Sequence, residues 1–420
     1  MASQSRSSIK KSEQAFLLGV YASKRARPLQ EISLDELGRL AETAGAVVCD
    51  RSLHELHRPN AATYIGKGLA EEIGQKGALK EIDVVIFDED LSPTQQRNLE
   101  KIIGIKILDR TGLILDIFAS RARSNEGKIQ VELAQLAYTL PRLTGKGVML
   151  SQLGGGIGTR GPGETKLELD RRKAHERLSK LKAQLAPIRE HRERHRTNRA
   201  AISLPLVSLV GYTNAGKSTL MNQLTHAGVL TEDKLFATLD PTVRKLRLPS
   251  GREVLLADTV GFVRKLPHQL VEAFYATFEE AQDSALLLHV VDASFPYAKE
   301  QMKVVETVLK DLKLDQKPRI TLYNKADKIP SIPLELSTLK AMNISALTGK
   351  GLTDLLEQIE TYLSSSFRKL SLKLSYNLGS ELSTLYRTSR ILKRKDQADG
   401  IHLEVEVDEI NYNKFLKYQD

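Results

Sequence analysis

The stretch Gly211-Tyr212-Thr213-Asn214-Ala215-Gly216-Lys217-Ser218 fits the phosphate-loop pattern GxxxxGK[ST] and decides the fold of this 420-residue chain. It follows the apolar run 204–210, typical of a strand, and precedes 219–224, typical of a helix. A loop in that context directs backbone N–H groups and a helix N-terminus at an anion, the geometry that nucleotide phosphates need. We expect Lys217 to be a surface loop residue that reaches the β- and γ-phosphates, and Ser218 to ligate Mg²⁺. A glycine turn that matches by chance is the less favoured reading.

Two later motifs predict that the nucleotide carries guanine. The apolar run 254–257 ends in Asp258-Thr259-Val260-Gly261, a DxxG motif that places a carboxylate toward Mg²⁺ through water and a glycine N–H toward a γ-phosphate. The apolar run 320–323 ends in Asn324-Lys325-Ala326-Asp327, an NKxD motif. The Asp327 carboxylate can accept two hydrogen bonds from guanine N1–H and its 2-amino group. Adenine would leave that acceptor unpaired.

Three neighbouring groups complete the expected base site. Asn324 should support the loop and the base edge, and the stem of Lys325 should lie on the ring plane. Ser345-Ala346-Leu347 follows at the distance expected for a loop that gives a backbone N–H to guanine O6. The ordered set of motifs predicts a GTPase.

The first switch offers two threonines for a second Mg²⁺ ligand. They lie in Phe236-Ala237-Thr238-Leu239-Asp240-Pro241-Thr242. Thr238 is favoured, because its distance from Ser218 suits one helix and a returning loop. Thr242 can instead be the first residue of a strand after the proline.

Phe262 occupies the position after DxxG, where a glutamine often orients the attacking water. A phenylalanine cannot hold water by hydrogen bonding. The functional reading is slow intrinsic hydrolysis in a site that a partner completes. The alternative is that Phe262 packs under the second switch, and both can hold together.

The predicted site therefore comprises three sets of residues. The catalytic residues are Lys217, Thr238 and Gly261. The Mg²⁺ ligands are Ser218, Thr238 and, through water, Asp258. The GTP-binding residues are Gly211, Tyr212, Thr213, Asn214, Ala215, Gly216, Lys217, Ser218, Thr219, Phe236, Ala237, Thr238, Leu239, Asp240, Asp258, Thr259, Val260, Gly261, Asn324, Lys325, Ala326, Asp327, Ser345, Ala346 and Leu347.

With these motifs, and with the glycine-rich run 151–165 before a basic helical stretch, the chain resembles the HflX-type GTPases of the Obg-like branch. The resemblance covers nearly the whole chain, from near Leu17. It implies a soluble, Mg²⁺-dependent, bacterial-type GTPase with GTP as substrate and GDP as product. It also implies binding to the large ribosomal subunit, through rRNA and ribosomal proteins, and a role in splitting or rescuing ribosomes, with hydrolysis stimulated by the ribosome.

Charge and cysteine content narrow the class of protein. The net charge of +10 and a pI near 9.4 favour a polyanionic partner such as RNA. The single cysteine, Cys49, excludes an intramolecular disulfide framework and is expected to be a buried strand residue. No apolar stretch reaches membrane-spanning length, and Met1–Lys11 lacks the apolar core of a signal peptide. We expect a cytoplasmic monomer, with peripheral membrane association left open.

The first part of the chain alternates strand-like and helical patterns, which predicts a small parallel sheet. The expected strands are 17–21, 47–49, 84–87 and 105–108, and the expected helices are 34–44, 67–75 and 93–103. The glycines of 64–68 match no complete phosphate-binding fingerprint, so a turn into a helix is preferred there.

A basic helical segment follows. Ala174, Leu178, Leu181 and Leu185 have the spacing of a helical-hairpin or coiled-coil seam, which Pro187 should end before 188–200 returns. From Lys166 to Arg199 there are twelve Lys/Arg against five Asp/Glu. Contact with rRNA is preferred over a solvated helix face. The predicted RNA-contacting residues are Arg160, Arg192, Arg194, Arg196 and Arg199.

The expected fold class is α/β, with a P-loop GTPase domain, a small parallel α/β domain and a helical hairpin before it, and a small βαβ domain after it. In that last domain, 370–376 and 401–407 alternate like strands around a helix at 381–392. The predicted boundaries are 1–13 for a disordered tail, 14–126 for the N-terminal domain, 127–200 for the helical spacer, 201–366 for the GTPase domain and 367–420 for the C-terminal domain. Two functions remain open: a GTP-driven ribosome switch, and an RNA-remodelling or assembly factor whose docking is gated by GTP.

Overall fold

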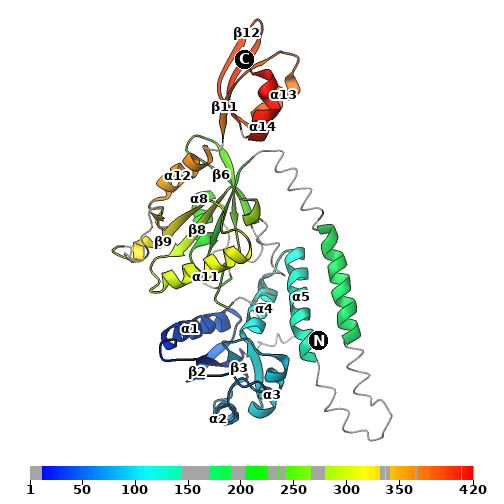
Figure 1. Ribbon diagram of the computed structural model, residues 1–420, viewed down its shortest axis with the longest axis vertical. Helices are drawn as coiled ribbons and strands as arrows, with labels where there is room; N and C mark the ends of the chain where they lie inside the picture. Colours follow the sequence, from blue (N-terminus) through cyan, green and yellow to red (C-terminus); the bar gives the residue numbers. More distant parts are fainter. Residues whose placement is uncertain are drawn as a thin grey trace, which may run out of the picture. The chain divides into compact units, whose positions relative to one another are not determined.

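The computed structural model describes residues 12–143, 171–188, 190, 204–225, 235–236, 242–265, 280–331, 336, 341–364, 367–407 and 409–419 (Figure 1). They form two compact units. The first comprises the described residues up to Leu185, together with 235–236 and 264–265, and the second comprises the rest. No helix within the described ranges is long and apolar enough to cross a bilayer.

The first unit is built on a four-stranded parallel sheet in the order β2-β1-β3-β4. Its strands are β1 (Gln14–Tyr21), β2 (Val47–Glu55), β3 (Val84–Phe87) and β4 (Lys106–Asp109). Helices α1 (Arg27–Thr43), α2 (Lys67–Leu79) and α3 (Pro93–Ile103) connect them. Apolar side chains of the central strands pack with those of α2 and α3, as Phe16 does with Ile73 and Leu99. The predicted parallel α/β unit is confirmed, including the turn into α2.

Local chemistry explains why α3 was predictable. Ser92 accepts a hydrogen bond from the backbone N–H of Gln95, and the Gln95 side chain accepts one in return from the Ser92 backbone, which forms a capping box. Pro93 occupies the first turn, where its missing N–H costs nothing. Gly104 ends the helix with φ 75°, a left-handed conformation that favours glycine.

The expectation that Cys49 is buried is wrong. Its side chain is exposed on β2, where it contacts Gln14. β2 is an edge strand, and its side chains alternate between exposed and half-buried positions. A short apolar run predicts a strand, but its position within the sheet decides whether both faces are covered.

Three helices follow the sheet of the first unit. α4 (Arg110–Arg121), which the sequence reading did not assign, begins directly after β4, with the Asp109 side chain accepting from the backbone N–H of Gly112. α5 (Asn125–Thr139) and the short 3-10 helix η1 (Leu140–Leu143) come next. Residues 171–188 are also helical, and Arg177 of this segment donates two hydrogen bonds to the carboxylate of Glu132 on α5.

The seam predicted on this helix is confirmed. Leu181 and Leu185 are buried, and Ala174 and Leu178 are half-buried between exposed neighbours. The expected break at Pro187 is wrong, because residues 186–188 continue the helix. A proline removes one N–H donor, which a helix can tolerate with a local bend.

The second unit contains a six-stranded sheet in the order β10-β9-β8-β5-β7-β6. Its strands are β5 (Leu206–Gly211), β6 (Thr242–Arg247), β7 (Glu253–Asp258), β8 (Leu286–Asp292), β9 (Arg319–Asn324) and β10 (Ala341–Asn343). All pairs are parallel except β6 with β7. The carboxyl ends of β5, β7, β8 and β9 therefore lie at one edge, where ligands bind in open α/β sheets.

Helices cover both faces of this sheet. α8 (Lys217–Thr225) and α12 (Leu352–Ser364) contribute Leu220, Leu355 and Ile359 to one apolar cluster, with Val207 and Leu288 from the strands. α11 (Ala298–Asp311) lies on the opposite face, with the cluster around Val291 and Tyr323. The described residues thus form a sheet with helices on both faces, which agrees with the predicted α/β GTPase domain.

The remaining residues of the second unit form a small α/β element around an antiparallel sheet in the order β11-β13-β12. Its elements are β11 (Arg368–Leu374), α13 (Gly379–Thr388), β12 (Arg390–Gln397), β13 (Gly400–Val407), α14 (Glu409–Phe415) and the 3-10 helix η4 (Leu416–Tyr418). The helix expected over 381–392 ends at Thr388, and residues 390–392 belong to β12 instead. β12 is a charged edge strand without apolar alternation, so its pairing with β13 has no clear signature in the sequence.

Candidate nucleotide-binding site

The predicted phosphate loop joins β5 to α8, and two of its glycines are required by close contacts. Gly211 has φ 152°, and a Cβ there would lie 2.2 Å from the carbonyl oxygen of Val290. Gly216 has φ 95°, and a Cβ there would lie 2.2 Å from Nδ2 of Asn324. Side chains at either position would force the loop away from β8 or from the NKxD motif.

Lys217 lies inside this loop, not on its surface as expected. Only 6% of the residue is exposed, and Nζ donates to the carbonyl oxygens of Gly211, at 3.0 Å, and Tyr212, at 2.8 Å. Burial lowers the pKa of Lys217 to about 8, against a smaller opposing effect of Asp258. A buried ammonium ion at the end of a parallel sheet is well placed to be stabilised by polyphosphate oxygens.

Ser218 and Asp258 meet at the carboxyl end of β7. The Ser218 hydroxyl donates to Asp258 Oδ2 at 2.6 Å, and Asp258 is fully buried. Hydroxyl and carboxylate oxygens are the hard ligands that Mg²⁺ prefers. This donor pair therefore fits the predicted cation.

The DxxG motif runs directly against the phosphate loop. A Cβ on Gly261 would lie 2.7 Å from Cα of Thr213 and 3.0 Å from Nζ of Lys217, so only glycine fits. Thr259 Oγ1 donates to the carbonyl of Leu209 at 2.6 Å, which ties the motif to β5. The glycine that is predicted to meet a γ-phosphate thus lies beside the lysine predicted to do the same.

Phe262 is held by its backbone and packed by its ring. Its N–H donates to the carbonyl of Gly211 at 3.2 Å, and its carbonyl accepts from the N–H of Thr213 at 2.8 Å. The side chain is fully buried. The packing interpretation therefore holds, and this position supplies no group that orients water.

The base-binding motifs converge on the same loop. Asn324 Nδ2 donates to the carbonyl of Ala215 at 2.8 Å, and its Oδ1 accepts from the N–H of Ala346 at 2.9 Å. One side chain thus joins the phosphate loop, the end of β9 and the Ser345-Ala346-Leu347 loop. This arrangement agrees with the expected supporting role of Asn324.

Asp327 and Lys325 complete this side. Ser345 Oγ donates to Asp327 Oδ1 at 2.6 Å, and this bond is the main cause that lowers the pKa of Asp327. The carboxylate remains an ionised acceptor. Lys325 Nζ donates to the carbonyl of Asn214 at 3.0 Å and pairs with Asp292 at 2.7 Å. Asp292 was missed by the sequence reading, although a carboxylate at the end of the apolar strand β8 is a signal for it.

The first switch is only partly described. Ala237, Thr238, Leu239 and Asp240 lie outside the described residues, as do Arg160, Arg192, Arg194, Arg196 and Arg199, so these assignments stay predictions. Thr242 is the first residue of β6 and lies opposite Asp258 in register, as expected for a strand start. Phe236, predicted to bind nucleotide, belongs to the first unit, where its ring packs edge-on against Phe118 at 4.6 Å.

A second short segment, Arg264–Lys265, also belongs to the first unit. Lys265 Nζ lies 2.8 Å from Asp88 Oδ2 and 2.6 Å from Glu89 Oε1, and the carbonyl of Arg264 accepts from Arg110 Nε at 3.1 Å. Arg110 and Asp88 are fully buried and lie 2.5 Å apart. Arg110 also contacts Glu36. The sequence reading missed this charge cluster, because its members are distant along the chain.

Fold and site together define a P-loop GTPase with guanine nucleotides as its ligands. Four family models match the chain: "GTP-binding GTPase N-terminal" over 31–119, "GTP-binding GTPase Middle Region" over 121–199, "50S ribosome-binding GTPase" over 206–325 and "HflX C-terminal domain" over 336–415. Curated relatives named GTPase HflX are similar over most of their length. The chain belongs to the HflX family of GTPases.

Two of these relatives show the extent of the likeness. The protein from Lacrimispora saccharolytica is 50% identical over 379 residues, which cover 89% of each chain. The protein from Escherichia coli is 40% identical over 413 residues, which cover 97% of this chain and 96% of that one. Among solved structures, a GTP-binding protein from Sulfolobus solfataricus in complex with GDP is 27% identical, with a TM-score of 0.43, covering 84% of this chain and 99% of that chain.

Proposed function

We propose that this GTPase binds the large ribosomal subunit, through rRNA and ribosomal proteins, and uses GTP to split or rescue ribosomes. Its intrinsic hydrolysis is slow and the ribosome stimulates it. The description of the matching family model, which names 50S ribosome binding, supports this target. The positive excess over Lys166–Arg199 supports phosphate contacts with rRNA, with Arg160, Arg192, Arg194, Arg196 and Arg199 as the proposed contacts. We further propose that the protein acts as a cytoplasmic monomer.

The observation that carries the proposal is the burial of Phe262. The residue after DxxG has no hydrogen-bonding side chain, and its ring is fully buried next to the phosphate loop. A site that lacks its own water-orienting group at this position hydrolyses GTP slowly until another molecule supplies one. The ribosome is the proposed source of that group.

The same proposal gives Mg²⁺ a place in the site. Ser218 would ligate the ion directly and Asp258 through water, with Thr238 as the proposed ligand from the first switch. When bound, Mg²⁺ neutralises the charge that develops on the phosphate oxygens during transfer. Lys217 and the N–H of Gly261 would hold the γ-phosphate, so Lys217, Thr238 and Gly261 remain the proposed catalytic residues.

Nucleotide state would reach the first unit through two short segments. Only Phe262 and Val263 separate Gly261 from Arg264, so a movement of Gly261 toward a γ-phosphate would pull on the ion pairs of Lys265. Phe236 would act in the same way from the first switch through its contact with Phe118. Segments that order around a γ-phosphate and relax after hydrolysis are the usual switching elements of GTPases.

Light scattering of ribosomes mixed with the protein tests the proposal. GTP and a non-hydrolysable analogue should both support dissociation into subunits, and GDP should not. Lys217→Ala, which removes the buried ammonium ion from the loop, should be inactive with either nucleotide.

Two results would contradict it. Dissociation that proceeds equally with GDP would show that the nucleotide state does not control it. If ribosomes did not change the steady-state rate of GTP hydrolysis, the proposal that the ribosome completes the site beside Phe262 would be wrong.

A further inference from the structure

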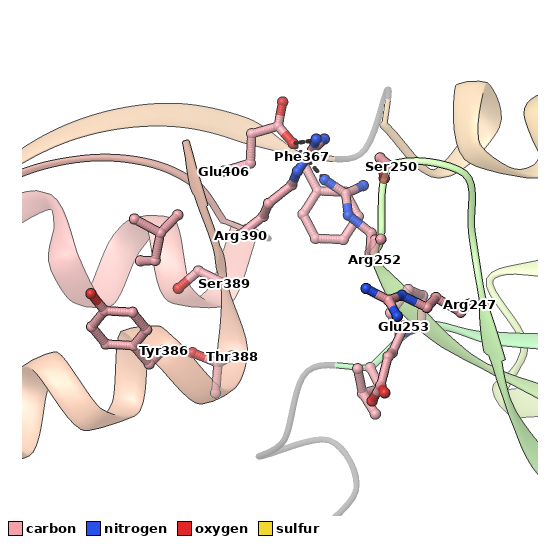
Figure 2. Close-up of a pocket in the computed structure, with 14 residues that line it drawn as sticks. Arg247, Ser250, Arg252, Glu253, Phe367, Tyr386, Thr388, Ser389, Arg390 and Glu406 are labelled. Atoms are coloured by element: carbon pink, nitrogen blue, oxygen red, sulfur yellow. Dashed lines mark hydrogen bonds and ion pairs between the residues drawn. The ribbon is translucent and has the colours of Figure 1, made fainter. Parts of the chain in front are cut away.

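A polar cavity of 590 Å³ lies in the second unit, away from the nucleotide site (Figure 2). One wall is the turn between β6 and β7, and the other is the end of α13 and the start of β12. Glu253, which lines it, begins β7, whereas Asp258 ends that strand at the nucleotide site. About 17 Å of strand separates the two positions. The cavity is within the size range of small-ligand sites.

The charge of the lining is positive. Three arginines, Arg247, Arg252 and Arg390, face two carboxylates, Glu253 and Glu406, which leaves an excess of one positive charge. Glu253 is also paired with Lys245 outside the cavity, at 2.8 Å. Among the described residues, no hydrogen-bond or ion-pair partner of the Arg247 guanidinium is present in the structure. The lining therefore attracts anions.

Glu406 links the two walls. Arg252 Nη2 donates to Glu406 Oε2 at 2.5 Å from one wall, and Arg390 Nη1 lies 3.7 Å from the same oxygen on the other (Figure 2). A single carboxylate oxygen thus faces two guanidinium groups. Their remaining N–H donors exceed what one carboxylate can accept.

Arg252 is held in place more firmly than a surface arginine. Its side chain is 9% exposed, and its guanidinium group lies over the ring of Phe367 at 4.2 Å. Its second terminal nitrogen, Nη1, and the hydroxyl of Ser250 are buried and have no hydrogen-bond partner among the described residues. Buried donors without an acceptor are rare in native proteins, so Arg252 would gain from a small shift that brings this group to a ligand oxygen.

The opposite wall carries three side-chain hydroxyls. The Tyr386 hydroxyl points away from the arginines of the cavity (Figure 2) and accepts a hydrogen bond from Arg394 at 2.8 Å. The hydroxyls of Thr388 and Ser389 donate to backbone carbonyls of α13 and present only lone pairs. The main donors of the cavity are therefore the three arginines.

We propose that this cavity binds a phosphate group, with Arg247, Arg252 and Arg390 as its main ligands. A planar carboxylate is satisfied by one guanidinium fork, whereas guanidinium groups on two facing walls suit an anion with several oxygens in three dimensions. Arg247 provides the unpaired charge, and Arg252 provides a fixed planar group. The phosphate belongs either to a small phosphorylated molecule or to an RNA backbone. Neither case depends on the function proposed above.

Binding to the full-length protein tests the proposal. The phosphate loop also binds phosphate, so the protein is first saturated with GDP. Isothermal titration with inorganic phosphate then probes the small-molecule source, and fluorescence anisotropy of a short single-stranded RNA, with phosphate as competitor, probes the backbone source.

The test variant is Arg247→Ala combined with Arg390→Ala. It should weaken binding of inorganic phosphate about tenfold or more, since hydrogen bonds to charged groups are among the strong ones. The matched control is Arg244→Ala combined with Lys299→Ala, which also removes two exposed positive charges of the second unit, both outside the cavity, and should bind as the unaltered protein does. Unchanged GDP affinity in each variant shows that the second unit is folded. Arg247→Ala alone, at an exposed position, replaces the double variant if that protein does not fold.

The outcomes separate cleanly. If the test variant loses phosphate binding but still binds RNA, the ligand is a small phosphorylated molecule. If inorganic phosphate displaces RNA and the test variant binds RNA more weakly, the ligand is a phosphate of an RNA backbone. Two results would overturn the proposal. One is that the test variant and the control bind phosphate with equal affinity. The other is that the GDP-loaded protein shows no binding of phosphate or RNA that depends on these arginines.

Discussion

At the scale of single residues, burial sets the chemistry of the nucleotide site. Lys217 and Asp258 are both buried at the end of a parallel sheet, where water does not screen their charges. Each charged group is held by hydrogen bonds to its neighbours, Lys217 by two loop carbonyls and Asp258 by Ser218. Preorganised groups of this kind spend little energy on rearrangement when phosphates bind.

Asp327→Asn should shift the base preference from guanosine toward xanthosine nucleotides. The carboxylate accepts two hydrogen bonds from guanine, whereas an amide offers one acceptor and one donor. GDP affinity should fall at least about tenfold, because hydrogen bonds to charged groups are among the strong ones. Titration with GDP and with xanthosine diphosphate measures both effects. Asp315→Asn, at an exposed position, is the control, and unchanged GDP selectivity in Asp327→Asn would refute the guanine assignment.

Phe262→Ala should destabilise the second unit by about 3–5 kcal/mol, because it removes a fully buried ring and leaves a cavity. If the ring only packs, ribosome-stimulated turnover should fall in proportion to the folded fraction. Urea denaturation followed by turnover assays with and without ribosomes gives both quantities. A selective loss of stimulation in the folded variant would show that the ring also shapes the completed site.

His289 should make the protein less stable in mild acid. It is buried on β8, and burial, with smaller effects of Arg319 and Lys217, lowers its pKa to about 3. The unfolded chain, with a pKa near 6.5, binds more protons between these values. The free energy of unfolding should therefore fall as pH drops from 6.5 toward 3, by at most about 1.4 kcal/mol per pH unit.

Urea denaturation of His289→Gln across this pH range measures the contribution. The difference in unfolding free energy between the unaltered protein and the variant should change steadily with pH. The control is His175→Gln, which removes an exposed histidine. A pH-independent difference for His289→Gln would mean that His289 does not titrate in this way.

At the scale of elements, two short segments are worth a functional test because they belong to the first unit, whereas the residues on either side of them along the chain belong to the second. Lys265 contacts Asp88 and Glu89 at the end of β3, and Phe236 contacts Phe118 of α4. Both Lys265 and Phe236 have positive φ, 51° and 55°, which non-glycine residues rarely adopt. Such conformations persist when surrounding contacts compensate for their cost, and they cluster at switch regions.

Lys265→Met should uncouple this segment from the nucleotide. Asp88 keeps its partner Arg110, so the first unit should remain folded, whereas Asp88→Asn would leave Arg110 poorly compensated and cost about 3–5 kcal/mol. GTP affinity should hold in Lys265→Met. The ratio of large-subunit affinities between the GTP-analogue and GDP states should shrink toward one, as measured by co-sedimentation.

Lys76→Met is the control for this experiment, because its ion pair with Glu72 is exposed on α2. An exposed pair of this kind contributes little to stability, and its loss should leave the affinity ratio unchanged. An unchanged ratio in Lys265→Met as well would show that these ion pairs serve stability alone.

At the scale of the whole molecule, the basic segment should carry the RNA affinity. Replacing Arg192, Arg194, Arg196 and Arg199 with Glu should weaken large-subunit binding and flatten its salt dependence. Each lost phosphate contact should lower the log–log slope by roughly 0.7–0.9. Co-sedimentation across a salt series measures the slope, and GTP affinity of the free protein should hardly change.

A matched charge reversal controls for net charge. The control replaces four exposed lysines on and after α11, which are Lys299, Lys303, Lys310 and Lys313. It changes the total charge by the same amount and should retain most of the salt slope. If the two charge reversals lowered the salt slope equally, the basic segment would be only a solvated helix face that does not contact RNA.

Most strands, most helices and the nucleotide motifs could be predicted from the sequence, because each depends on neighbours along the chain. β12 is an exception, since its charged residues show no apolar alternation. An apolar run predicts β5, the spacing GxxxxGK[ST] predicts the loop after it, and a helical pattern predicts α3 over 93–103. The family resemblance rests on the same local patterns. Their order along the chain was enough to predict a guanine-nucleotide site.

Burial and the pairing of distant charges could not be predicted from the sequence, because both depend on the tertiary structure. Cys49 is exposed because β2 lies at a sheet edge, and Lys217 is buried because its loop closes against the DxxG motif. The pairs of Lys265 with Asp88 and of Arg252 with Glu406 join residues more than 150 positions apart. Such contacts have no signature in a local window, since they exist only where the packing of separate elements brings the partners within a few ångströms.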